Sequence, residues 1–194
     1  MFRSQATFIV SAMAAAVAVT LPAVVAAVDV RVEFDKEFDF RAARTWGWHP
    51  DGAGEVKMAR TQDDDPEAMR ARAEPVIVEA VAAELSRRDV QFTTGTPDLF
   101  VTYYLLLTLG ASAQTLGQFV PATPEWGLPP FAAATQSLEI RNQGSLVLDL
   151  SAGGRVIWRG VAQAKIRLDT NDEKRRALIR ESVRDLLRSY PPKR

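Results

Sequence analysis

The sequence predicts an α+β domain in which a mostly antiparallel sheet of about five to six strands carries two amphipathic helices on one face. Two observations support this class. Most segments with strand periodicity follow one another directly, and only two segments have the apolar spacing and start signals of a helix. Grouped strands favour antiparallel pairing, and amphipathic helices bury their apolar stripe against one face of such a sheet.

The N-terminal part of the domain predicts two short strands and a loop. Residues 28–34 alternate strictly between apolar and charged side chains, which is typical of a strand with one buried face. Residues 45–48, with the sequence Thr-Trp-Gly-Trp, predict a second short strand. Residues 50–65 are rich in glycine and acidic side chains, and they predict a surface loop.

The first helix should begin close to Asp65. This residue is a suitable N-cap, and Pro66 is favoured at the first helical position. Pro75 lacks an amide hydrogen, so either the helix kinks there or its main body begins there. Apolar residues recur on one broad face between residues 76 and 85, and this face should pack on the sheet.

A long apolar strand is expected at the centre of the sheet. Residues 98–110 alternate between one apolar face and a second face that includes Phe100, Tyr104 and Leu106. Because both faces are largely apolar, the strand should be central, with its second face also largely covered. A shorter strand is predicted at residues 90–93.

Residues 111–135 show neither helix nor strand periodicity. The segment holds four prolines and three large aromatic residues, Phe119, Trp126 and Phe131. A loop of this length in a compact domain is usually functional or disordered. Two alternatives stay open: the aromatic side chains are anchors for a partner, or they fold back and cover the outer face of the Tyr104 strand.

A β-hairpin is predicted between residues 146–150 and 156–161, joined by a three-residue loop that contains glycine. The length of the loop sets which residues of the two strands lie opposite each other. With a three-residue loop, Trp158 is a core anchor on the helix side. Asp149 and Arg159 lie diagonally on the other face. Their charges could orient a ligand, but we expect an exposed cross-strand pair worth less than about 1 kcal/mol.

One further strand and a second helix complete the domain. The strand is predicted at residues 136–143. Thr170 and Glu173 have the spacing of a capping box, with Thr170 as the N-cap. The helix that follows carries apolar residues at helical spacing and ends before Pro191.

Residues 1–27 have the pattern of a secretory signal peptide. Arg3 supplies a positive n-region, residues 8–21 form an apolar run, and small residues suited to signal peptidase end the segment. Cleavage there leaves a chain that begins near Val28 and is periplasmic, with no stable membrane anchor. The alternative is an uncleaved segment that anchors the chain in the inner membrane, since residues 8–27 together are just long enough to span a bilayer.

Composition restricts the chemistry of the single domain expected at residues 28–194. The 24 basic and 24 acidic residues balance, which argues against nucleic acid as a partner because phosphate binding needs a basic surface. Without cysteine there is no disulfide, thiol nucleophile or zinc–thiolate site. With a single histidine, and no EF-hand spacing in the acidic run at residues 63–65, we expect no metal and no cofactor.

Five short motifs resemble those of one bacterial family, in the same order along the chain. They are the opening strand with Thr45-x-x-Trp48, Ala80–Leu85, Pro97-Asp98-Leu99, the hairpin with Gly144-x-Leu-x-x-Asp149 and Trp158-Arg159-Gly160, and Tyr190-Pro191-Pro192. The family is the bacterial domain of unknown function 4136, whose members are mostly assigned as envelope lipoproteins. This chain departs from the common member because it lacks the lipidated cysteine.

The resemblance implies an α+β domain in the cell envelope and supplies no catalytic residues. It marks six positions as structural motif residues: Trp46, Asp98, Asp149, Trp158, Arg159 and Gly160.

Two functional hypotheses follow from these observations. The first is a non-enzymatic periplasmic or cell-envelope domain that binds or scaffolds an envelope protein or ligand, with Phe119, Trp126 and Phe131 as candidate contacts. The second is a small envelope hydrolase or ligand-binding enzyme that uses carboxylates around the sheet. A pocket with two close, partly buried carboxylates would favour the second hypothesis. His49 has no recognisable catalytic partner and is expected to be a surface-loop residue.

Overall fold

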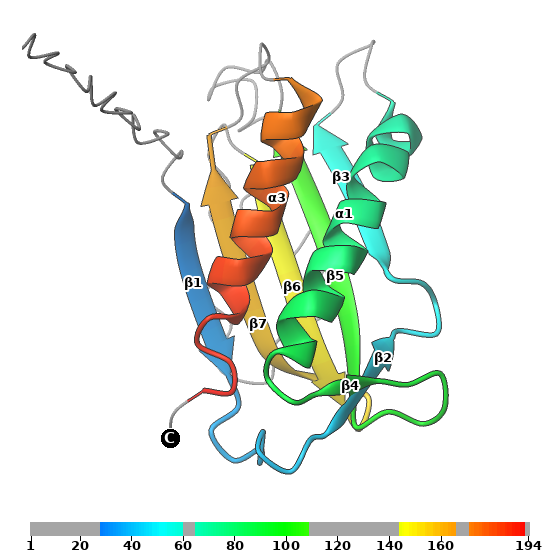
Figure 1. The fold of residues 1–194 in the computed structure, drawn as a ribbon, viewed down its shortest axis with the longest axis vertical. Coiled ribbons are helices and arrows are strands. Elements are labelled where there is room, and N and C mark those ends of the chain that lie inside the picture. Colours follow the sequence, from blue (N-terminus) through cyan, green and yellow to red (C-terminus); the bar gives the residue numbers. More distant parts are fainter. Residues whose placement is uncertain (1–27, 60–64, 109–143, 166–170, 193–194) are drawn as a thin grey trace, which may run out of the picture.

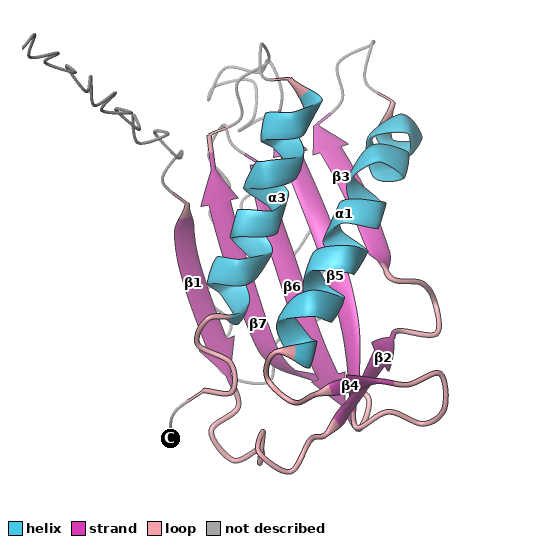
Figure 2. Ribbon diagram, viewed as in Figure 1, coloured by secondary structure: helices cyan, strands magenta, loops and turns pink. Residues whose placement is uncertain are grey.

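The computed structural model describes residues 28–59, 65–108, 144–165 and 171–192 of the chain. Within this part of the chain, a seven-stranded sheet carries two helices, α1 (Pro66–Ser86) and α3 (Asp172–Leu187), on one face (Figure 1). Figure 2 shows the same two layers coloured by secondary structure. The predicted α+β class is therefore confirmed.

The sheet is mixed, so the prediction of a mostly antiparallel sheet with five to six strands is wrong. The strand order is β1-β7-β6-β5-β2-β4, and β3 also pairs with β5. The antiparallel strands are β1 (Asp29–Phe34), β7 (Arg155–Ala164), β6 (Gly144–Ala152) and β5 (Leu99–Thr108). The parallel ones are β2 (Thr45–Trp48), β3 (Gly54–Ala59) and β4 (Gln91–Phe92). Helix α1 provides the long crossover that parallel pairing with β5 requires.

Strand β3 occupies part of the segment for which the sequence predicts a loop. Val56 and Met58 alternate with polar residues and pack against the core, so a short strand period is present within the glycine- and acid-rich segment. Gly54 is needed where β3 meets β5, because a Cβ atom there would lie 2.2 Å from the carbonyl oxygen of Tyr103. Overall composition was a weaker guide than this local alternation.

Helix α1 begins as predicted and continues through its proline. The Asp65 side chain accepts hydrogen bonds from the backbone amides of Glu67 and Ala68 at 3.0 and 3.1 Å. Pro75 lies inside one unbroken helix. Pro75 and Ala71, whose carbonyl loses its helical donor, are both exposed, so water can satisfy that carbonyl.

The cap of helix α3 differs from the prediction by one residue. Asn171 is the N-cap, and its side-chain oxygen accepts a hydrogen bond from the Lys174 amide at 2.9 Å. Asparagine caps a helix as well as threonine does, and the cap is set by which residue takes the extended backbone conformation. Thr170 lies outside the described residues.

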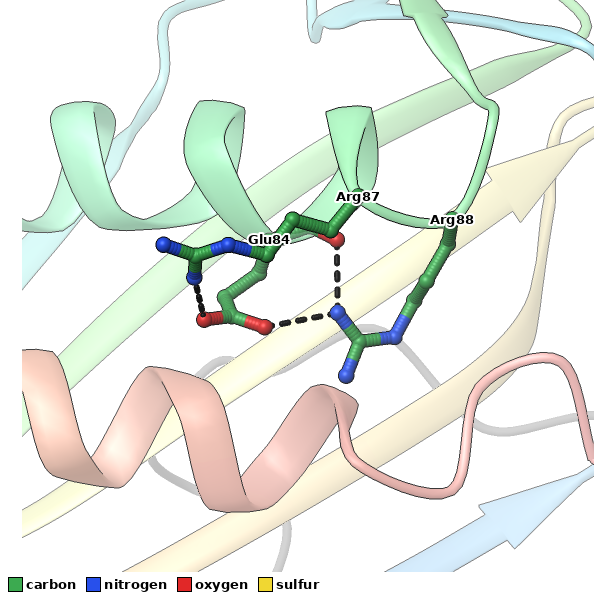
Figure 3. A network of polar contacts seen from close by, with 3 residues as sticks. All are labelled: Glu84, Arg87 and Arg88. Atoms are coloured by element: carbon green, nitrogen blue, oxygen red, sulfur yellow. Dashed lines mark hydrogen bonds and ion pairs between the residues drawn. The ribbon is translucent and has the colours of Figure 1, made fainter.

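A buried carboxylate closes the C-terminal end of α1 (Figure 3). The Glu84 side chain accepts hydrogen bonds from both Arg87 and Arg88, and Arg88 also donates to the Glu84 carbonyl oxygen at 2.6 Å. Cations suit a helix C-terminus, and Arg87 is the C-cap of α1. The two arginines also neutralise a carboxylate that the helix packing removes from water.

The hydrophobic core lies between the sheet and the two helices. Its largest fully buried side chains include Trp46, Tyr103 and Trp158. The indole of Trp158 lies over Gly160, where an added Cβ would come within 2.5 Å of the ring and 2.8 Å of Leu186 in α3. The predicted core position of Trp158 on the helix side is confirmed, and the Trp-Arg-Gly motif thereby acquires a packing explanation.

Candidate functional site

The face of the sheet opposite the helices, here called the outer face, is also largely buried. Tyr104, Leu106, Val147 and Val161 form an apolar cluster there, separate from the main core. Leu106 and Val147 are fully buried. The prediction that the second face of the central strand is covered is confirmed for Tyr104 and Leu106, whereas Phe100 is only half-buried.

A row of polar residues crosses the outer face beside this cluster. Thr102 on β5 pairs with Asp149 on β6, Asp149 pairs with Arg159 on β7, and Arg159 pairs with Glu33 on β1. Residues directly opposite one another in a sheet are neighbours on the same face. The row therefore places a threonine hydroxyl, two carboxylates and a guanidinium side by side across four strands.

Asp149 and Arg159 form a buried, bidentate ion pair, so the expected exposed diagonal pair is wrong. Arg159 donates from Nε to Asp149 Oδ1 at 2.7 Å and from Nη2 to Oδ2 at 2.5 Å. Asp149 is 2% exposed. Burial raises the pKa of Asp149, and the bond from Arg159 opposes that rise. Burial acts to lower the pKa of Arg159, but its bond to Asp149 and the attraction between the two charges raise that pKa overall, so the guanidinium stays charged.

The geometry of the hairpin explains the error in register. The turn contains two residues, Gly153 and Gly154, with φ angles of +58° and +77°, and Ala152 pairs with Arg155. Both central residues of such a tight turn need positive φ, which glycine adopts without strain. An irregularity between Leu150 and Ser151 then shifts the pairing by one residue. This shift brings Asp149 directly opposite Arg159.

A cavity of about 520 Å³ opens on the outer face beside this ion pair. Three segments enclose it: the connection between β2 and β3, the first half of β5, and the end of the β6–β7 hairpin. Its polar lining consists of His49, Asp51, Glu55, Thr102, Tyr104, Asp149, Ser151 and Arg155. We call this cavity the outer-face pocket. It is the candidate functional site.

His49 lies at the rim of the outer-face pocket. Its Nδ1 accepts a hydrogen bond from the Asp51 amide at 3.3 Å and lies 3.5 Å from the Asp51 carboxylate. Its ring meets Phe100 edge to face, with 5.9 Å between centroids. His49 does lie in a loop, as predicted, but the prediction did not include its place at the outer-face pocket. Most of the residues that form the pocket with it belong to β5 and the β6–β7 hairpin, which are distant in sequence, and no local motif signals them.

Charged side chains around the outer-face pocket are held by counter-ions. The pairs are Asp149–Arg159, Arg155–Asp35 and Glu55–Lys57, with closest N···O distances of 2.5, 2.6 and 3.1 Å. The pKa of Asp35 is lowered mainly by the Glu37 amide, which donates to its carboxylate, and also by Arg155. Asp51 differs, because its neighbour is the imidazole of His49 and its side chain is 93% exposed.

Asp98 serves the fold and does not line the outer-face pocket. One of its carboxylate oxygens accepts bonds from the Arg44 amide, the Thr45 amide and the Thr45 hydroxyl, at 2.9, 2.9 and 2.8 Å. The Asp98 amide in turn donates to the Thr45 hydroxyl at 3.0 Å. These bonds lower the pKa of Asp98 and fix the start of β2 against β5.

Of the six motif residues, the structure places two at the pocket. Asp149 lines it, and Arg159 holds Asp149 from the neighbouring strand. Three others have packing roles. Trp46 and Trp158 belong to the core between the sheet and the helices, and Gly160 packs against the Trp158 indole. The candidate contacts Phe119, Trp126 and Phe131, and the strand predicted at residues 136–143, lie outside the described residues.

Among the described residues, no group of three or more histidine and carboxylate side chains could hold a metal ion. Neither helix in this part of the chain is long and apolar enough to cross a membrane.

Solved structures of proteins from several bacteria superpose on this chain to different extents. A protein of the DUF4136 family from Bacteroides thetaiotaomicron superposes with a TM-score of 0.50 at 15% identity, over 84% of this chain and 96% of that chain. A PDZ domain protein from Parabacteroides distasonis has a TM-score of 0.48 at 14% identity, over 86% of this chain and 37% of the other. PelC of Paraburkholderia phytofirmans, a dodecamer, has a TM-score of 0.37 at 9% identity, over 83% and 95%.

All three structures are less than 25% identical to this chain, and the second and third have TM-scores below 0.5. Of the three, the DUF4136 structure therefore supports the fold, and it supports nothing beyond the fold. No curated protein matches the chain. The family model described as a domain of unknown function, DUF4136, matches residues 30–192. This match spans almost the whole domain and agrees with the motifs in the sequence, and the chain therefore belongs to the DUF4136 family.

Proposed function

We propose that this domain is a non-enzymatic binding module of the bacterial cell envelope and that its ligand enters the outer-face pocket. One observation carries the proposal. The pocket is concave, is floored by adjacent strands of the sheet, and has its buried carboxylate, Asp149, already neutralised by Arg159. Small-molecule sites occupy clefts of roughly 300–1,000 Å³ with a few fixed polar groups, and this pocket falls within that range.

The same geometry favours binding over hydrolysis. Two close, partly buried carboxylates were the expected sign of an enzyme. Among the described lining residues, Asp149 is the one buried carboxylate, and both of its oxygens accept bonds from Arg159. Asp51 and Glu55 are exposed. A general acid or base must exchange a proton with its substrate, and the guanidinium bonded to both oxygens of Asp149 favours the carboxylate over the protonated form. This pairing supports an accepting or structural role better than proton transfer.

Residues 1–27 and the family support a location in the envelope. The N-terminal segment has the charge, apolar run and small residues of a signal peptide, although it lies outside the described residues. Export would place the outer-face pocket in the periplasm. The partner would then be an envelope protein or a ligand found in that compartment.

Site-specific photo-crosslinking in the producing cells tests the proposal. A photoreactive residue at Asp51, on the exposed pocket rim, should give a discrete adduct. The matched control is the same residue at Glu173, which is exposed in the first turn of α3. Adducts from Asp51 alone support a binding site at the pocket. Equal labelling at both positions, or none at either, contradicts it.

A second contact surface is proposed at residues 111–135. The strands that flank the segment pair at Leu107 and Gly144, at the end of β5 away from the pocket. Changing Phe119, Trp126 and Phe131 together to serine should leave the melting temperature almost unchanged and abolish capture of the partner. If the triple variant unfolds, the aromatic residues belong to the folded domain and this surface is wrong.

A further inference from the structure

The charges that line the outer-face pocket are mostly cancelled within the protein. Asp149, Glu55 and Arg155 each have an ion-pair partner at 3.1 Å or less. A charged ligand would have to lose its own water and compete with counter-ions that are already in place. The remaining carboxylate, Asp51, is open to water, which screens it. A neutral ligand meets neither cost.

Hydroxyl groups from two adjacent strands point to hydrogen bonding as the mode of recognition. Thr102 and Tyr104 on β5 and Ser151 on β6 all line the pocket. Each hydroxyl can both donate and accept. Burial raises the pKa of Tyr104 to about 12, so its phenol remains a donor at neutral pH. The hydroxyl of Ser151 reaches the Phe100 carbonyl only at 3.4 Å, a weak bond that a ligand can replace.

The floor of the pocket adds acceptors without adding net charge. Each oxygen of Asp149 takes one bond from Arg159, and a carboxylate oxygen has a second lone-pair position. A ligand hydroxyl can therefore donate to Asp149 while the ion pair stays intact. Such charge-assisted bonds are shorter and stronger than bonds between neutral groups.

Aromatic rings provide the apolar part of the lining. Phe100 and His49 meet edge to face at the rim, and Tyr104 lies farther along the same strand as Phe100. The electron-rich faces of such rings attract C–H groups. A matching ligand presents hydroxyls on its edges and C–H groups on its faces.

From these observations we infer that the outer-face pocket binds a neutral, polyhydroxylated ligand of the saccharide class. The inference rests on the proposed binding function and specifies its ligand. Recognition uses the hydroxyls of Thr102, Tyr104 and Ser151, the free acceptor positions of Asp149, and the ring of Phe100. Charge contributes little, so affinity should depend only weakly on salt.

Titration with defined trisaccharides tests this inference. The purified full chain would be titrated, by isothermal calorimetry and two-dimensional NMR, with maltotriose, cellotriose and chitotriose as neutral probes. Trigalacturonate and trilysine serve as anionic and cationic probes of similar size. Tyr104→Phe and Ser151→Ala remove one hydroxyl each and keep the shape of the site. Ser189→Ala removes an exposed hydroxyl outside the pocket and is the matched control.

At least one neutral probe should bind, and each pocket variant should weaken it at least fivefold. Ser189→Ala should change the affinity less than twofold, and melting temperatures should show that all variants remain folded. Tight binding of only a charged probe, neutral binding that survives both pocket variants, or no binding of any neutral probe at 20 mM would overturn the inference. If the Asp51 adduct forms in cells but no neutral probe binds, the ligand class is wrong and the binding function stands. If that adduct also fails to form, the proposed function is wrong.

Discussion

Replacing Gly160 with alanine should destabilise the domain, because the position has no room for a methyl group. An ideal Cβ at Gly160 would lie 2.5 and 3.0 Å from two carbons of the Trp158 indole and 2.8 Å from Leu186 Cδ2. Trp158 and Leu186 are both fully buried, so neither side chain can swing into solvent to make space. Either the indole must leave its position or α3 must move away from β7.

The expected cost is that of overpacking a filled core. Inserting one methylene in such a site typically costs about 1–3 kcal/mol, and the two short contacts here place Gly160→Ala in the upper half of that range. For a domain of this size, about 2–3 kcal/mol corresponds to a fall in Tm of roughly 4–12 °C. Thermal unfolding followed by circular dichroism and urea titration at constant m-value would measure it.

Two comparisons make the measurement specific. Gly95→Ala adds the same methyl group where the nearest atom is the Thr93 hydroxyl at 3.5 Å, so its stability should change by less than about 0.5 kcal/mol. In a Trp158→Phe background the ring is smaller, and the cost of Gly160→Ala should fall by at least about 1 kcal/mol. A Tm for Gly160→Ala within 1 °C of the wild type would refute this packing argument.

Three further predictions concern the ion pair, a lowered pKa and the N-terminus. Arg159→Met leaves Asp149 buried without its counter-ion and should cost about 3–5 kcal/mol in urea unfolding, whereas adding Asp149→Asn should restore part of that loss; additive costs would contradict the pairing. Because the pKa of Asp98 is lowered in the folded state, its contribution is present above the unfolded value of 3.8 and lost as the pH falls through the folded value. Asp98→Asn should therefore be less stable than wild type at pH 6, and the difference should shrink as the pH falls below 3.8; a difference in urea midpoint that stays constant with pH would argue against this role. Mass spectrometry of the protein from cells should find an N-terminus near Val28 without an acyl chain; intact Met1 in the membrane fraction would show that cleavage fails.

The sequence correctly predicted those helices and strands that carry a clear local signal, such as a cap or a regular alternation of apolar residues. The start of α1 at Asp65 follows from a cap and a proline in adjacent positions, and β5 follows from unbroken alternation. The core role of Trp158 followed from the face it shares with other apolar residues of the hairpin. These features depend on neighbours within a few residues, so one chain contains enough information to assign them.

Strand pairing could not be predicted with the same success. β3 was hidden in a segment whose composition favours a loop, and its parallel pairing with β5 depends on the crossover through α1. The register of the hairpin changed because a two-residue turn and one irregularity near Ser151 each displace the pairing. A single residue of slip decides whether Asp149 faces Arg159 or passes it diagonally.

The sequence alone determined the class of the domain, its apolar faces, its family and the absence of thiol chemistry, since these depend on composition and short-range order. The outer-face pocket came only from the folded chain. It joins His49, Tyr104 and Ser151, which lie far apart in sequence and become neighbours because β2, β5 and β6 are adjacent in the sheet. Burial of the Asp149–Arg159 pair is likewise a property of the assembled sheet, because the free energy of a charge depends on how much water the rest of the fold removes from it.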